Sequence, residues 1–528
     1  MRKCIVMAAA IMFLAFLAVP VFADRENLVK NGDFKNGYTG WFDYKNDEGS
    51  YIPGVENDML KVKLTNPGLN PWSIAAGQSS INLVKGTVYT VKFSAKGDTP
   101  NPIKVVIQKA DAPYTNYSGR FIKLADKMKD YTFSFTMKSD SEANSSIQFQ
   151  MGTAGKGEVY ITNVSIVNMG APPELTIPTE FPKPFAPKMM HGVNFGNTLD
   201  APNEGEWGPE LRPDYFDIIK NKGIFDTIRI PCRWETHSMD KPPYTIDPAF
   251  MKRVDWAVSS ALNKGFYAVL NMHHHTEFEN NPMQQKERWL ALWKQVAEHF
   301  AKYPDNLMFE LYNEPGSHQE DKAGTLEDED VWNKIWPEAF RVIRESNPLR
   351  TIVISGPNWA SPNTLTHLVI PDDLDKDPNK IMQFHFYYPE NFCFQGAQGS
   401  GFESTSGIRW KGSKDEKDTI KYKFYVMTKW AKEHNYKLWN GEFTSFPVKS
   451  VPEDRLKWIG FIVSTCEENG IPWCYWDFAN DQSRLYNPDE NTWDDATIKA
   501  IEKGMKTKPA KQTNAEEKET KAAETEVQ

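Results

Sequence analysis

The segment LMFELYNEP, residues 307–315, is a mostly apolar run that ends in polar residues. Its first six residues have the character of a short buried strand, and Asn313, Glu314 and Pro315 follow directly. Seven similar runs lie elsewhere in the chain, and between them apolar residues recur with the three-four spacing of helices. The eight runs are 190–195, 227–231, 267–272, 307–312, 351–355, 381–388, 437–443 and 472–478.

Alternating strands and helices predict an α/β fold, and eight such repeats over roughly 320 residues predict a (β/α)8 TIM barrel, here residues 188–505. In this fold the functional side chains lie at the carboxyl ends of the strands. The fourth run leads into Glu314, and the seventh contains Glu442. Two facing carboxyl groups, one protonated and one ionised, are what cleavage of a glycosidic bond requires. A single glutamate at a strand end is more often part of a structural ion pair. The prediction of glycosidic cleavage therefore depends on having both Glu314 and Glu442.

The residues at the strand ends resemble glycoside hydrolase family 5, in its cellulase and β-mannanase branch. The motif 313–315 resembles the acid/base motif of that family, and 441–443 resembles its nucleophile strand. The segments APNEGEWG at 201–208 and PPY at 242–244 strengthen the likeness. Other residues that match the family pattern are Arg229, His273, His274, His385, Tyr387 and Trp476.

This resemblance implies a retaining endo-β-1,4-glucanase that acts on cellulose or mixed-linkage β-glucan, with mannan or glucomannan as a further substrate. It implies that Glu314 is the general acid and base and that Glu442 is the nucleophile. Arg229 and Tyr387 are expected to hold Glu442, and His385 is expected to lie near Glu314. The other expected substrate contacts are Asn313, His273, His274, Trp476, Asn203 and Glu204.

Three alternative functions stay open at this point: an endo-β-1,4-mannanase, a β-1,3-glucanase, and a glycan-binding protein without catalytic activity. Three consecutive histidines, 273–275, suggest a metal, but neighbouring residues on a strand point to opposite sides. We therefore expect neither a catalytic metal nor a cofactor. A calcium ion in the N-terminal module and the oligomeric state are left open.

The amino terminus has the pattern of a secretory signal peptide over residues 1–23. Arg2 and Lys3 precede an apolar run, and the small residue Ala23 ends the segment. We therefore expect a secreted protein, extracellular or on the cell surface. The net charge of −9 argues against nucleic acid as a partner, and no later run is long enough to cross a membrane. Four of the five cysteines lie after this segment, fit no zinc motif and are expected to be buried thiols.

Residues 24–168 contain short β-rich runs separated by Gly, Asn, Asp and Pro, which predict an all-β sandwich. Its two ends, Asn27–Trp41 and Val159–Ile166, resemble carbohydrate-binding modules of the jelly-roll kind. The resemblance implies a β-linked polysaccharide as the partner. Trp72, Tyr114 and Tyr117 are candidates for a sugar-binding platform, although ordinary core or loop roles are equally open.

Two segments outside the domains are recognisable from composition. Residues 169–187 contain six prolines, which predict an extended, semi-rigid linker that separates the domains. The alternative is that Leu175, Ile177 and Phe181 pack on the following domain as a fixed arm. Residues 506–528 are mostly Lys, Glu, Ala and Thr, which predict a disordered tail.

Overall fold

The computed structural model describes residues 26–172 and 175–507. Eight parallel strands, paired in chain order, close into a barrel, so the predicted TIM barrel is confirmed. Each strand lies within one residue of a predicted apolar run. The strands are β11 (His191–Asn194), β12 (Thr227–Ile230), β13 (Tyr267–Asn271), β14 (Leu307–Glu310), β15 (Ile352–Ser355), β16 (Lys380–His385), β17 (Leu438–Phe443) and β18 (Trp473–Tyr475).

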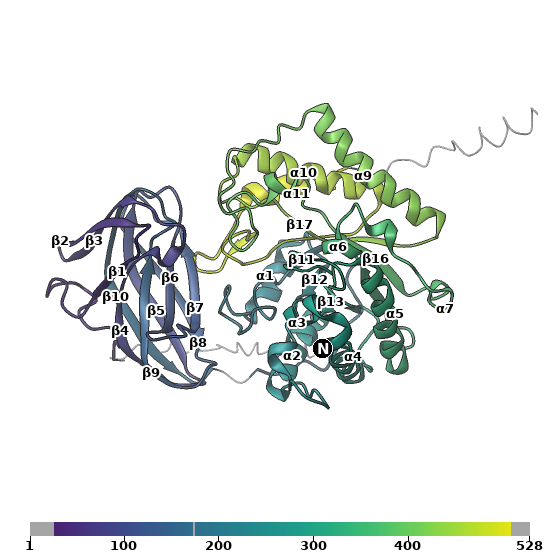
Figure 1. Cartoon of the computed structure of the whole chain (residues 1–528), viewed down its shortest axis with the longest axis horizontal. Coiled ribbons are helices and arrows are strands. Elements are labelled where there is room, and N and C mark those ends of the chain that lie inside the picture. Colours follow the sequence, from purple (N-terminus) through teal and green to yellow (C-terminus); the bar gives the residue numbers. More distant parts are fainter. Residues whose placement is uncertain (1–25, 173–174, 508–528) are drawn as a thin grey trace, which may run out of the picture.

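Long helices surround the barrel and bury its outer face (Figure 1). They are α1 (Asp214–Lys222), α2 (Pro248–Asn263), α4 (Pro282–His299), α5 (Glu329–Ser346), α9 (Lys414–Glu433), α10 (Pro452–Asn469) and α11 (Asp495–Met505). The connection between β15 and β16 departs from this pattern, since it holds only α6 (Pro357–Ala360), a 3-10 turn and α7 (Asp372–Asp375). Short helices α3 (Thr276–Asn280) and α8 (Glu390–Cys393) lie in the loops after β13 and β16. A small hairpin, β19 (Tyr486–Asn487) and β20 (Thr492–Trp493), precedes α11.

The interior of the barrel is layered because alternate residues of each strand point inward. One layer is apolar and buried, and it consists of Met189, Val269, Met308, Val353, Ile381, Trp439 and Cys474. Two residues further along several strands, the inward side chains are polar and fully buried: Asn271, Glu310, Ser355 and Gln383. The barrel interior is thus filled by an apolar layer, and a polar layer lies above it, next to the carboxyl ends of the strands.

The N-terminal domain is an antiparallel β-sandwich, as predicted. One sheet has the order β1 (Phe42–Lys45), β4 (Ile74–Leu83), β9 (Glu142–Gln150), β6 (Ile103–Lys109) and β7 (Asn116–Ile122). The other has the order β2 (Ser50–Glu56), β3 (Met59–Asn66), β10 (Gly157–Gly170), β5 (Val88–Gly97) and β8 (Lys129–Thr136). Of the candidate platform residues, Trp72 and Tyr114 are exposed, whereas Tyr117 packs partly against the sandwich core.

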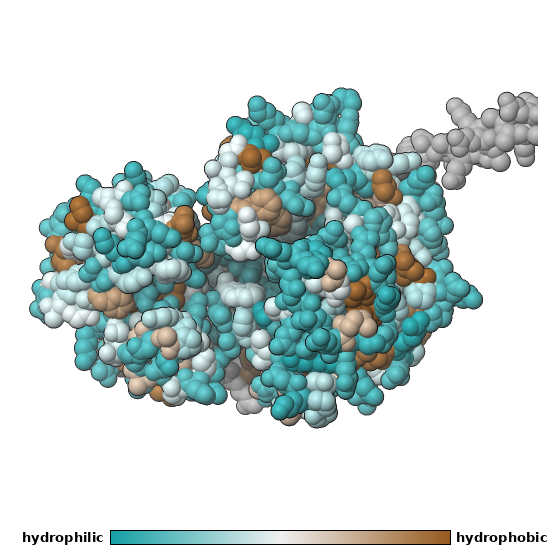
Figure 2. Space-filling model, in the orientation of Figure 1, coloured by the Kyte–Doolittle hydropathy of each residue, from teal (hydrophilic) through white to brown (hydrophobic). Residues whose placement is uncertain are grey.

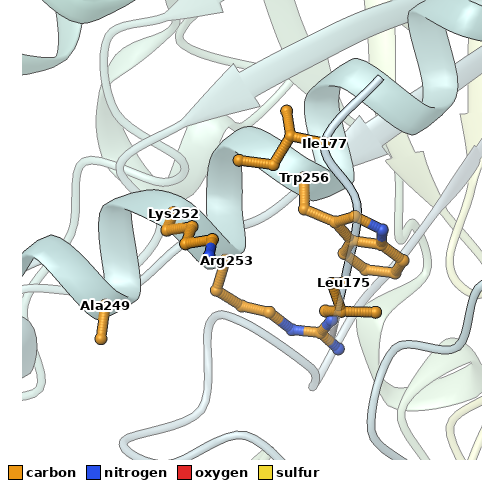
Figure 3. Close-up of a pocket in the computed structure, with 6 residues that line it drawn as sticks. All are labelled: Leu175, Ile177, Ala249, Lys252, Arg253 and Trp256. Atoms are coloured by element: carbon orange, nitrogen blue, oxygen red, sulfur yellow. The ribbon is translucent and has the colours of Figure 1, made fainter. Parts of the chain in front are cut away.

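The proline-rich segment is not a free spacer. Leu175, Ile177 and Phe181 pack against the barrel core, and the Phe181 ring lies 5.2 Å from that of Tyr303. Figure 3 shows Leu175 and Ile177 beside α2, where they line a cavity of about 200 Å³. The prediction of a separating linker was therefore wrong, and the alternative of a fixed arm is correct. The segment is fixed because the apolar side chains between its prolines are partly buried against the barrel, at Trp256 of α2 and at Tyr303.

The two domains also touch directly, which the sequence did not indicate. Edge strands β7 and β8 of the sandwich face the barrel (Figure 1). The backbone N–H of Phe121 donates to Asp481 Oδ2 at 2.9 Å, and Lys129 pairs with Glu490. Polar contacts of this kind cover backbone groups that an edge strand would otherwise leave unpaired.

The cysteines and the absence of a membrane-spanning helix among the described residues agree with the expectations. The face in Figure 2 is mostly hydrophilic, with hydrophobic residues in small separate patches. Among the described residues, no helix is both long and apolar enough to cross a membrane. Cys232, Cys393, Cys466 and Cys474 are buried free thiols, as expected. The predicted signal peptide, and the predicted tail from residue 508 onward, lie outside the described residues.

The fixed arm predicts resistance to proteolysis. Trypsin should cleave the wild type slowly after Lys188, because cleavage requires the arm to leave the barrel. Replacing Leu175, Ile177 and Phe181 together by serine should accelerate cleavage there at least tenfold, as followed by electrophoresis and mass spectrometry. Leu349→Ser, at a leucine that is 70% exposed, is the matched control and should have no effect. Equally rapid cleavage of the wild type and the triple variant would contradict the packed arm.

Candidate active site

The guanidinium of Arg229, on β12, is the centre of a hydrogen-bond network at the carboxyl end of the barrel. Its Nη1 donates to Glu442 Oε1 at 2.6 Å, and its Nε and Nη2 donate to the two oxygens of Glu310 at 2.7 and 2.6 Å. Two further bonds go to the side-chain oxygens of Asn194 and Asn313 at 2.9 and 2.7 Å. Burial alone would lower the pKa of Arg229, but Glu310 and Glu442 raise it above its ordinary value. The buried arginine therefore stays cationic and fixes two carboxylates.

Glu310 is a part of this network that sequence reasoning missed. Its side chain is fully buried, and it also accepts hydrogen bonds from Asn271 Nδ2 at 3.1 Å and Gln383 Nε2 at 2.9 Å. A signal was available, because a glutamate within an apolar strand is seldom fully buried unless it is paired. Glu310 holds one edge of the Arg229 guanidinium, so that the other edge is aimed at Glu442.

The predicted carboxyl pair does meet across the mouth of the barrel. Glu442 lies on β17, and Glu314 lies in the loop after β14. A carboxyl oxygen of Glu314 lies within 4.8 Å of one of Glu442, and His385 Nδ1 lies between them, nearer to Glu314 and 3.8 Å from Glu442 Oε2. Glu442 Oε2 accepts a hydrogen bond from the Tyr387 hydroxyl at 2.8 Å, whereas Glu314 Oε1 lies 2.6 Å from His385 Nδ1.

The two carboxyl groups differ in their affinity for a proton. Burial raises the pKa of Glu314 to about 8. Burial also raises the pKa of Glu442, but His385 and Arg229 act in the opposite direction, and Arg229 donates to this carboxylate directly. Burial lowers the pKa of His385 to about 4, so this imidazole is neutral near pH 7. The arrangement favours a proton on Glu314 and a negative charge on Glu442.

A row of rings leads outward from this pair. The Trp476 ring is parallel to the His273 ring at 5.6 Å, and His274 lies 4.6 Å beyond His273. The Trp207 ring lies 5.7 Å from His274 and was not among the predicted residues. Burial lowers the pKa of His273 well below its usual range and that of His274 to about 3. Neutral imidazoles and an indole face suit the hydroxyls and C–H faces of sugars.

The side chains of the two loop residues predicted as substrate contacts are engaged by other protein groups. Both oxygens of Glu204 are taken up: Arg253 contacts Oε1 at 2.7 Å and Oε2 at 3.0 Å, and Lys138 of the sandwich contacts Oε2 at 2.5 Å. The expectation of a sugar contact at Glu204 was therefore wrong, because two cations already hold this buried carboxylate. Asn203 donates to Glu206 Oε2 at 3.1 Å and so bonds within its own loop.

Two groups of described residues bring potential metal ligands within 4.8 Å of one another. One group is Glu314, Glu442 and His385, in which the carboxyl oxygens have the partners described above. The other is Asp200 with His273 and His274, where the Asp200 oxygens already accept backbone N–H groups of Asn197 and Thr198 at 3.0 and 2.8 Å. The carboxylate oxygens of Asp200 and Glu442 are thus already used as hydrogen-bond acceptors.

Comparisons with known proteins agree with this geometry. Residues 189–482, more than half of the chain, match the family model described as cellulase, glycosyl hydrolase family 5. Residues 26–156 match a carbohydrate-binding domain model. The sequence is 33% identical to Endoglucanase H of Acetivibrio thermocellus over 340 residues, which is 62% of this chain and 35% of that protein. The chain thus spans about a third of the length of that curated relative.

Solved structures of one protein show the same barrel. Thermotoga maritima Cel5A in complex with mannotriose is 36% identical, with a TM-score of 0.55, over 59% of this chain and 97% of that one. The same protein in complex with cellobiose gives the same identity, TM-score and coverage. With its barrel, its facing glutamates and the match over residues 189–482, the chain belongs to glycosyl hydrolase family 5.

Proposed function

We propose that the protein is a retaining endo-β-1,4-glucanase that hydrolyses cellulose or mixed-linkage β-glucan. The observation that carries the proposal is the close approach of Glu314 and Glu442, within 4.8 Å, with Arg229 bonded to Glu442. Carboxyl groups about 5–5.5 Å apart are typical of retaining glycosidases, whereas inverting enzymes need about 6.5–9.5 Å to admit a water molecule.

The first chemical step forms a covalent intermediate. An oxygen of Glu442 attacks the anomeric carbon, the bond from that carbon to the glycosidic oxygen breaks, and Glu314 gives its proton to the departing oxygen. Tyr387 and Arg229 orient the attacking carboxylate through the two hydrogen bonds already described. Neutralising Glu442 in the ester removes a negative charge next to Glu314.

The second step uses that change of charge. The carboxyl repulsion that helped to keep Glu314 protonated is gone, so its pKa falls and it can act as a base. A water molecule attacks the anomeric carbon, Glu314 takes a proton from it, and the ester bond to Glu442 breaks. Both carboxyl groups then return to their starting states.

Glucan is favoured as the main substrate by the endoglucanase relative, and mannan is a second candidate. The Thermotoga maritima Cel5A structures with cellobiose and with mannotriose support a cleft that admits either sugar. A β-1,3-glucanase and a glycan binder without activity remain as outcomes of the tests below. The signal-like residues 1–23 support secretion.

A substrate panel tests this specificity. The purified full chain should release reducing ends fastest from carboxymethylcellulose or mixed-linkage β-glucan, and more slowly from galactomannan. A preference for galactomannan would make it a mannanase, and a preference for β-1,3-glucan would replace the proposed linkage. Binding to all of these without hydrolysis would establish the non-catalytic alternative.

Removing the nucleophile should abolish turnover. Glu442→Ala should lower kcat about 10⁴-fold or more on soluble glucan, because no covalent intermediate can form. Glu433→Ala, at a glutamate near the end of α9 that pairs with Lys429, is the matched control and should retain wild-type activity. For Glu442→Gly, added azide should restore cleavage of an aryl β-cellobioside and give an α-glycosyl azide. A β-configured azide product would contradict the role assigned to Glu442.

The pH profile should show the raised pKa of Glu314. For the wild type, kcat/KM should fall as the pH rises through about 8, because the acid then loses its proton. It should also fall on the acidic side, as Glu442 becomes protonated at a pKa above its ordinary value. Glu314→Gln should lose the alkaline limb and slow substrates with poor leaving groups by about 10²–10⁴-fold, while a dinitrophenyl cellobioside is affected less. An alkaline limb that persists in this variant would contradict the assignment.

A further inference from the structure

The loop between β11 and α1 is bound to the sandwich at every second residue. Lys138 contacts Glu204, and Asn116 Nδ2 donates to the Glu206 carbonyl at 3.4 Å. Arg120 Nη1 donates to the Gly208 carbonyl at 2.7 Å. The Glu210 carboxylate accepts from the backbone N–H of Thr136 at 2.9 Å and from its hydroxyl at 3.0 Å. Residues 204, 206, 208 and 210 thus each contact the sandwich, two through a carboxylate and two through a backbone carbonyl.

These contacts are built into the structure and are not incidental surface pairs. Arg120 is only 3% exposed, and Glu204 is 6% exposed. Glu204 is held from the barrel side as well, since Arg253 on α2 forms a two-point contact with it. Arg253 also lines the cavity at the fixed arm (Figure 3). A buried charge that loses a partner is costly, so the loop is held in one position.

Trp207 lies in the middle of this loop, at the outer end of the row of rings. Its side chain is 40% exposed, and its ring meets His274 edge-on at 5.7 Å. The Arg233 guanidinium lies 5.7 Å from the centre of the indole ring, and the Trp207 carbonyl accepts a bond from Asn480 at 3.3 Å. An indole fixed by its neighbours and still partly open to solvent can stack on a sugar ring.

We infer that the sandwich is a positioning element of the substrate cleft: it holds the 204–210 loop so that Trp207 binds a sugar unit beyond those at Trp476 and His273. This inference rests on the proposed glucanase activity. It gives the N-terminal domain a role that tethering alone does not provide, because tethering raises local concentration without changing contacts at the cleft. The domain should then affect hydrolysis of soluble oligosaccharides that are long enough to reach Trp207.

The test uses full-length variants in which the domain stays attached. Arg120→Ala/Lys138→Ala releases the loop, Trp207→Ala removes the ring, and a triple variant combines them. The control is Lys85→Ala, whose lysine forms an exposed ion pair with Asp140 within the sandwich. The measurements are kcat/KM on cellohexaose and on a short aryl β-cellobioside, with thermal unfolding to verify folding. If the double variant does not fold, Lys138→Met, which keeps the side-chain stem, takes its place.

The double variant and Trp207→Ala should each lower kcat/KM on cellohexaose about three- to tenfold, the size expected for one aromatic contact. Neither should change the rate on the short substrate. The triple variant should lose no more than either alone, because both changes act through Trp207. Wild-type kinetics for the released loop, or losses that multiply in the triple variant, would overturn the inference alone. A wild type inactive on every glucan would overturn the proposed function and this inference with it.

Discussion

The buried guanidinium of Arg229 is the constraint on which the catalytic end of the barrel depends. One positive charge in the polar layer requires negative partners, and Glu310 and Glu442 supply them from opposite sides. Separating either pair would leave an uncompensated charge in the interior, which typically costs about 3–5 kcal/mol. The position of Glu442, the proposed nucleophile, is therefore set by an ion pair that the folded barrel itself needs.

The chemistry follows from an asymmetry around that arginine. All hydrogen bonds of its guanidinium go to Glu310, Glu442, Asn194 and Asn313. Within the described part of the chain, Glu314 therefore keeps only the neutral His385 as a hydrogen-bond partner. Burial then acts on Glu314 without a compensating cation in contact, and its pKa rises. Two identical side chains acquire opposite roles because their surroundings differ.

Much of this was predictable from the sequence, and the failures have physical causes. Eight apolar runs that alternate with helical spacing predict the barrel, and the motifs around Glu314 and Glu442 predict the pair that meets. Glu310 was missed because it lies inside an apolar run, whereas the prediction considered only polar residues at the ends of the runs. Glu204 was misassigned, and Trp207 overlooked, because their roles depend on a sandwich docked against the loop. Such contacts between domains leave no periodic signal in the chain.

The most direct test of the facing carboxyl pair is the configuration of the first product. Proton NMR during early hydrolysis of a β-1,4-linked glucan oligosaccharide, before mutarotation, distinguishes the two anomers. A pair this close, acting through two displacements at one carbon, gives the β-anomer first. Initial release of the α-anomer would mean a single displacement by water and would contradict the arrangement of Glu314 and Glu442 described here.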